Sequence, residues 1–235
     1  MRFIAGLAVA ATMTLCLSLG SAHADRRVAA VTGKNTHTNL PGDRQIKTAE
    51  SLKADEHFQP TSLQGHAVLL LEEVRAPVIR VEGTVSWRFD PSKGTKGAVY
   101  AVVDFPQRAL KMQITFEPNT DQSLRASHTA EVNFITEADS PGGGVETMAN
   151  IVMKASEDEV GAPSLSGSVV PVTNGVFLVG LTESMRVGNL QLLKNRSWFE
   201  IPVTFATRHR RALIAFEKGA SGEHALNEAF SEWGD

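Results

Sequence analysis

The stretch Val81-Glu82-Gly83-Thr84-Val85-Ser86-Trp87-Arg88-Phe89 alternates between apolar or small side chains and polar ones. Successive side chains of a β-strand point to opposite faces, so this period of two predicts a strand with one buried face and one face in water. The residues that follow, Asp90-Pro91-Ser92-Lys93-Gly94, are of turn-forming types and end the strand. The stretch therefore predicts a β-protein whose strands are joined by short turns.

Alternating or continuous apolar runs typical of strands recur along the rest of the chain. Further strand-like runs cover residues 67–71, 99–103, 110–116, 130–134, 165–172, 176–181, 199–205 and 212–216. Asn174-Gly175 between two of these runs predicts a tight hairpin, because a type I′ turn needs positive φ at both central residues. Strands recur about every ten residues with turn residues between them. We therefore predict one all-β domain over residues 66–235, folded as an antiparallel β-sandwich.

The C-terminal residues have a helical period instead. Ser221 is a good N-cap residue, and a stripe of apolar side chains follows at i, i+3, i+4 and i+7: Leu226, Ala229, Phe230 and Trp233. This spacing predicts a short helix over residues 221–233 whose apolar stripe docks on the sandwich.

The first residues have the pattern of a secretory signal peptide. Arg2 supplies a short positive start, residues 3–19 are apolar or small, and Ala24 closes a small-x-small cleavage pattern. We expect cleavage after Ala24 and a periplasmic or secreted protein. The polar residues 25–65 predict a flexible leader ahead of the folded domain.

The composition excludes several classes of protein. The chain has 235 residues, 42% of them hydrophobic, and a net charge of −3, which fits a globular domain and argues against a nucleic-acid partner. The one cysteine, Cys16, lies in the predicted signal peptide. The exported chain would therefore have no disulfide and no thiol nucleophile. No second stretch is long and apolar enough to span a membrane.

A search for catalytic motifs finds no Gly-x-Ser-x-Gly elbow, His-Glu-x-x-His or phosphate-binding loop. Ser127-His128 is the nearest approach to a nucleophile and base, but adjacent residues of a strand point to opposite faces. We interpret the pair as the start of a strand. The histidines are scattered, and Asp104, Glu117 and Asp121 are interpreted as solvated charges. We expect no catalytic residues, no metal site and no cofactor.

The densest positive cluster is Arg208-His209-Arg210-Arg211, between two predicted strands. Its position predicts a charged hairpin tip. A bare, solvated tip is one interpretation. The other is a contact site for an anionic headgroup, a glycan or the face of a protein.

Three stretches together carry a resemblance: residues 119–129, residues 189–202, and residues 211–219 with the closing helix. They resemble an uncharacterised family of alphaproteobacterial envelope proteins, over about residues 74–235. The resemblance implies an envelope compartment and a domain boundary, and it brings no established activity or site residues. The final strands and helix are also similar to the invasion-associated locus B proteins, whose typical cysteines this chain lacks.

These observations favour a periplasmic, non-catalytic binding or protein-interaction domain. The expected partner is an envelope protein or an anionic surface, and the expected contact site is Arg208–Arg211. One alternative is a hydrolase acting on envelope glycan or lipid, with a site assembled across strands. Another is a periplasmic chaperone or stress regulator that uses the polar leader.

Overall fold

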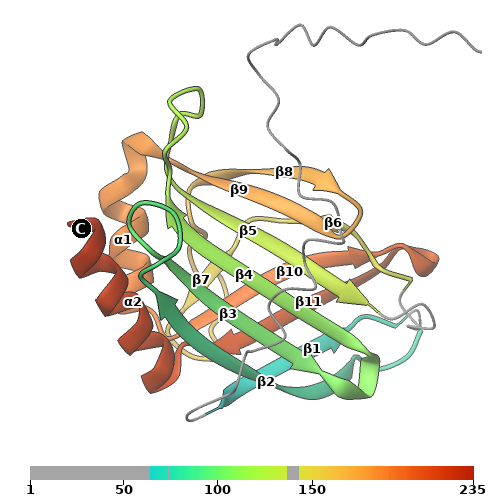
Figure 1. Cartoon of the computed structure of the whole chain (residues 1–235). Helices are drawn as coiled ribbons and strands as arrows, with labels where there is room; N and C mark the ends of the chain where they lie inside the picture. Colours follow the sequence, from blue (N-terminus) through green and yellow to red (C-terminus); the bar gives the residue numbers. More distant parts are fainter. Residues whose placement is uncertain (1–63, 74, 137–142) are drawn as a thin grey trace, which may run out of the picture. The chain divides into compact units, whose positions relative to one another are not determined.

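A computed structural model describes residues 64–73, 75–136 and 143–235 (Figure 1). The predicted signal peptide with Ala24, and the predicted leader up to residue 63, lie outside the described residues.

Antiparallel strands make up most of the described chain. They are β1 (Gly65–Leu71), β2 (Ile79–Asp90), β3 (Ala98–Phe105), β4 (Leu110–Pro118), β5 (Ala126–Thr136), β6 (Val145–Met148), β7 (Val152–Lys154), β8 (Gly167–Thr173), β9 (Val176–Thr182), β10 (Trp198–Phe205) and β11 (Arg210–Glu217). Two α-helices accompany them, α1 (Arg186–Asn195) and α2 (Gly219–Trp233), together with short 3-10 turns at 106–108, 183–185 and 207–209. The predicted all-β class with a C-terminal helix is confirmed.

The strands form one continuous sheet rather than the two stacked sheets of the predicted sandwich. Their order is β6-β10-β11-β1-β2-β3-β4-β5-β9-β8, and β7 continues the β6 side of β10. The two sides of the sheet meet where Val152 bridges Ser164, just before β8, and the Met153 amide donates to the Pro163 carbonyl at 2.8 Å. The sheet therefore curls into a nearly closed barrel-like shape (Figure 1).

The inner face of this sheet carries the core. Val81, Val85 and Trp87 of β2 are buried, as the alternating pattern predicted, while Glu82 between them is exposed. Gly83 lies on the same inner row, and a Cβ there would run into the Phe105 ring and the backbone of Asp104. Glycine at this position lets the next strand's aromatic ring pack directly on the β2 backbone.

Helix α2 docks as its apolar stripe predicted. Leu226, Ala229, Phe230 and Trp233 are all buried, mainly against β2. The helix begins at Gly219, two residues before the prediction, and its N-cap position is Lys218 rather than Ser221. Figure 1 shows α1 and α2 together at one end of the curled sheet, with the β10–β11 hairpin at the other.

Helix α1 was not predicted from the sequence. Its apolar residues Val187, Leu190, Leu192 and Leu193 form only a weak one-sided pattern, and Val187 is exposed, so local sequence indicates the helix poorly. The helix is completed by a distant residue: Lys218 is buried and its Nζ donates to the carbonyls of Leu193 (3.2 Å) and Lys194 (2.9 Å). A cation at these carbonyls satisfies the end of α1 and complements its dipole.

Candidate functional site

The hairpin between β10 and β11 has an unusual backbone at its tip. Arg208 and His209 both lie in the left-handed region, with φ of 61° and 47°. Residues with a Cβ are disfavoured there, by roughly 1–2 kcal/mol each. In the β8–β9 hairpin the positive φ, 73°, falls on Gly175. Asn174 has no positive φ, so the tight hairpin is present but its turn is not the predicted type I′.

The tip side chains reach acidic partners on neighbouring segments. His209 Nδ1 lies 2.8 Å from Glu146 Oε2, and Arg210 Nη2 lies 2.7 Å from Glu73 Oε1. Arg211 pairs with Glu72. The His209 contact is exposed, with 77% of the His209 side chain open to solvent, whereas Arg210 and Glu73 are partly buried. Exposed ion pairs contribute only about 0–1 kcal/mol, so an incoming ligand displaces the His209 contact at little expense in stability.

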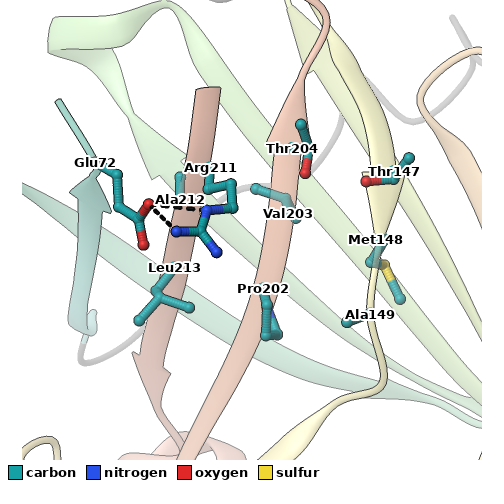
Figure 2. A pocket seen from close by; sticks show the side chains of 10 residues that line it. All are labelled: Glu72, Thr147, Met148, Ala149, Pro202, Val203, Thr204, Arg211, Ala212 and Leu213. Carbon is teal, nitrogen blue, oxygen red and sulfur yellow. Dashed lines mark hydrogen bonds and ion pairs between the residues drawn. The ribbon is translucent and has the colours of Figure 1, made fainter. Parts of the chain in front are cut away.

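A groove of about 260 Å³ runs beside the tip across the outer face of β11, β10 and β6 (Figure 2). Its lining residues are Glu72, Thr147, Met148, Ala149, Pro202, Val203, Thr204, Arg211, Ala212 and Leu213. Arg211 spans to Glu72 at one rim, with Nη2 2.8 Å from Oε2. The groove thus joins the predicted positive cluster to an apolar surface.

A second cavity, of about 490 Å³, lies where the β8–β9 hairpin faces the start of β6. Phe134 and Phe177 line it, with their rings edge to face and 5.9 Å between centroids. Glu146, the partner of His209, and Ala206 of the hairpin also line it. The tip and its partners therefore border both cavities.

Ser127 and His128 do not form a nucleophile–base pair. Ser127 Oγ donates to the Leu181 carbonyl at 3.4 Å. Both side chains are buried, and the pairing of β5 with β9 shifts register between Ala126 and His128. Strand pattern alone gives no sign of such a bulge.

His128 belongs instead to a buried polar cluster at the end of α2. Its Nε2 lies 2.9 Å from Asp235 Oδ2, although neither atom has hydrogen-bond geometry, and its ring centroid is 5.1 Å from that of Trp233. Arg186 Nε donates to the other carboxylate oxygen of Asp235 at 3.0 Å. Burial lowers the pKa of His128, and the positive charge of Arg186 lowers it further. The negative charges of Asp235 and Glu183 raise this pKa and so offset part of the effect.

This cluster predicts that the domain loses stability in acid. The pKa of His128 is lower in the folded chain than its ordinary value of about 6.5, so between the two values the unfolded chain binds more protons. The free energy of unfolding should fall as pH falls through this window, which lies below about 6.5. In His128→Asn this part of the pH dependence should disappear from melting temperatures measured by circular dichroism. His224→Asn, at an exposed histidine of α2, is the control, and an unchanged pH dependence in His128→Asn would contradict the prediction.

The remaining residues considered in the sequence have local partners. His66 contacts Glu82, His224 lies 3.6 Å from Glu228, Lys111 lies 3.5 Å from Asp104, and Ser123 Oγ donates to Asp121 at 2.7 Å. His37 and His57 lie outside the described residues. Within the described ranges, no three histidine, cysteine or acidic side chains gather as they would around a metal ion. No helix of the described part is long and apolar enough to cross a membrane.

The outer-face groove and the buried cluster were both missed by sequence reasoning. The groove depends on which residues of three strands stand opposite one another, which the sequence does not show. Asp235 and Arg186 are far from His128 in the chain, so no local sequence pattern predicts that the three side chains lie together. Comparisons of the chain with protein-family models, with curated proteins and with solved structures gave no match.

Proposed function

We propose that this protein is a non-catalytic binding domain of the periplasm, which holds an envelope partner at the hairpin tip Arg208–Arg211. The signal-peptide pattern of residues 1–24 supports the compartment. The tip supports the contact, since it projects three arginines and a histidine beside an open groove.

The observation that carries this proposal is the left-handed backbone at Arg208 and His209. Glycine would occupy such a position with less strain, as Gly175 does in the β8–β9 hairpin, and asparagine tolerates a positive φ better than most residues. Neither side chain is buried, so packing in the core does not explain their presence. Residues held in such conformations are found preferentially at binding and active sites, where the side chain is needed for something other than stability.

The proposal predicts a stability gain when the tip is given an unstrained turn. The double variant Arg208→Asn with His209→Gly should raise the free energy of unfolding by about 1 kcal/mol, because relief of backbone strain outweighs the exposed contact of His209 with Glu146. For a domain of this size the melting temperature should rise by roughly 2–4 °C. Thermal unfolding followed by circular dichroism measures this change.

The same variant should lose its partner. Affinity capture from crosslinked envelopes should recover a reproducible partner with the wild-type chain and much less of it with the double variant. Lys93→Asn, which removes an exposed cation from the turn after β2, is the matched control and should capture as well as wild type. Equal recovery by the double variant, or the absence of any reproducible partner, would overturn the proposal.

A further inference from the structure

The groove beside the tip has two chemically different sides. On its first row of outward-facing positions, Thr204 stands opposite both Thr147 and Arg211. Arg211 extends this row to Glu72 (Figure 2). The row therefore offers two hydroxyls and one charged pair along a line that crosses the strands.

The neighbouring row is apolar. Pro202 stands opposite Leu213, which in turn stands opposite Leu70 of β1. Ala149 continues the row on the far side, since its amide donates to the Pro202 carbonyl at 2.9 Å. Same-face positions of a strand are about 7 Å apart, so one extended chain lying across the strands contacts both rows at once.

Arg211 keeps part of its binding capacity. Its Nε and Nη2 both approach the same oxygen of Glu72, at 2.9 Å and 2.8 Å. Within the described part of the chain, Nη1 has no such contact, and Figure 2 draws none to it. An arginine fork binds a planar carboxylate well, so a ligand carboxylate is complementary to this free side of the guanidinium.

The size and charge of the groove favour a protein segment over other anionic ligands. A volume of about 260 Å³ holds one or two side chains and is small for a whole drug-sized molecule. None of the lining residues is aromatic, so a sugar ring finds no ring face to stack on. Glu72 lies at the rim, and Glu73 and Glu146 pair with the tip, so a membrane surface with many anionic groups would meet all three carboxylates, whereas a segment with a single carboxylate meets the free side of Arg211.

We propose that the groove binds an extended segment of a partner protein in which an acidic residue adjoins an aliphatic one. The acidic side chain pairs with Nη1 of Arg211, and the aliphatic side chain covers Pro202 and Leu213. Thr147 and Thr204 hydrogen-bond to the backbone of the segment. This inference rests on the proposed function and adds the class of partner.

A selection from a displayed library of random linear peptides tests this assignment on the full exported chain. The selected sequences should share an acidic residue next to an aliphatic one. Binding of a synthetic consensus peptide, measured by fluorescence anisotropy, should weaken at least about tenfold in Arg211→Glu, the loss of one charge-assisted contact. It should weaken by a smaller factor in Leu213→Thr, which keeps a strand-forming residue at that position.

Matched variants control for charge and for surface polarity. Lys93→Glu reverses an exposed charge elsewhere, and Val170→Thr makes the same kind of change at an exposed valine of β8. Both should bind the consensus peptide like wild type. Circular dichroism confirms that each variant is folded before its binding is measured.

Three outcomes would overturn the inference. The selected peptides share no consensus; the consensus peptide binds Arg211→Glu and Leu213→Thr as tightly as wild type; or the protein binds phosphatidylglycerol vesicles through its tip and binds no peptide. The proposed function is judged separately. If the natural partner is lost in the tip variant Arg208→Asn with His209→Gly but kept in Leu213→Thr, the tip is a binding site and the groove assignment is wrong. Arg211 belongs to both the tip and the groove, so Leu213→Thr is the variant that separates them.

Discussion

Replacing Phe199 by alanine is expected to lower the free energy of unfolding by about 3–5 kcal/mol, the usual result for a large aromatic residue in a core. The Phe199 side chain is completely buried. Its ring lies nearly parallel to that of Phe216, 5.1 Å between centroids, and 5.2 Å from that of Trp87. These three residues come from the nearby strands β10, β11 and β2, and the Phe116 ring of β4 lies 6.1 Å from that of Phe199, so the variant leaves a cavity inside the curled sheet.

Urea unfolding followed by tryptophan fluorescence measures this loss. Val187→Ala is the control, because that valine is 71% exposed on α1 and should change stability by less than about 0.5 kcal/mol. A loss below about 1 kcal/mol in Phe199→Ala would mean that these rings do not form the centre of the core.

Replacing Arg186 by alanine should have the second largest effect, a loss of about 2 kcal/mol. The Asp235 side chain is only 1% exposed, and Arg186 is the permanent cation beside it. Removing one partner leaves a buried charge without compensation, which destabilises by several kcal/mol in a fully buried pair. We expect less here because the arginine itself is 42% exposed and its charge is partly screened by solvent.

A second variant separates this charge effect from lost packing. In Arg186→Ala with Asp235→Asn, the orphaned carboxylate is replaced by a neutral amide of the same shape. The double variant should recover at least half of the stability that Arg186→Ala loses, as measured by urea unfolding at neutral pH. Equal stabilities of the single and double variants would show that the buried carboxylate does not depend on Arg186.

Local pattern was enough to predict most strands. Residues 81–89 alternate because β2 has one face in the core, and residues 199–205 do so for the same reason. Residues 212–216 are instead a continuous apolar run, of which only Leu213 is not buried. Helix α2 was equally clear, since its four stripe residues are all buried. In these segments the pattern of each element agrees with its place in the fold.

The arrangement of the strands was not accessible in the same way. Apolar and polar residues alternate in the same way in a strand of a sandwich and in a strand of a curled sheet. The sequence pattern therefore does not distinguish one curled sheet from the two sheets of the predicted sandwich. The closure depends on the contact between Val152 and Ser164, which lie in short segments without an alternating pattern. Helix α1 depends on Lys218, a residue more than twenty positions away, so no local pattern could show it.

The candidate site, too, was predicted from the sequence only in part. The sequence predicted the charged tip Arg208–Arg211 from composition and position, and its hairpin location agrees with the structure. The left-handed backbone at Arg208 and His209 had no signal in the sequence, since Arg-His is not a turn-forming pair. A positive φ on residues that do not favour it becomes evident only in the structure. Arg75 and Ala109 also have one, and the tip differs from them in having two in succession beside a groove.

Site-specific photo-crosslinking tests the central claim most directly. A benzophenone amino acid at Ala206, an exposed position two residues before the tip, reports what lies against the tip in intact envelopes. The same probe at Val187, exposed on α1, serves as the reference position. We predict a discrete adduct from position 206 that is absent at position 187 and is lost when Arg208→Asn and His209→Gly are added. No adduct at position 206, or the same adducts from both positions, would contradict a binding role for the tip.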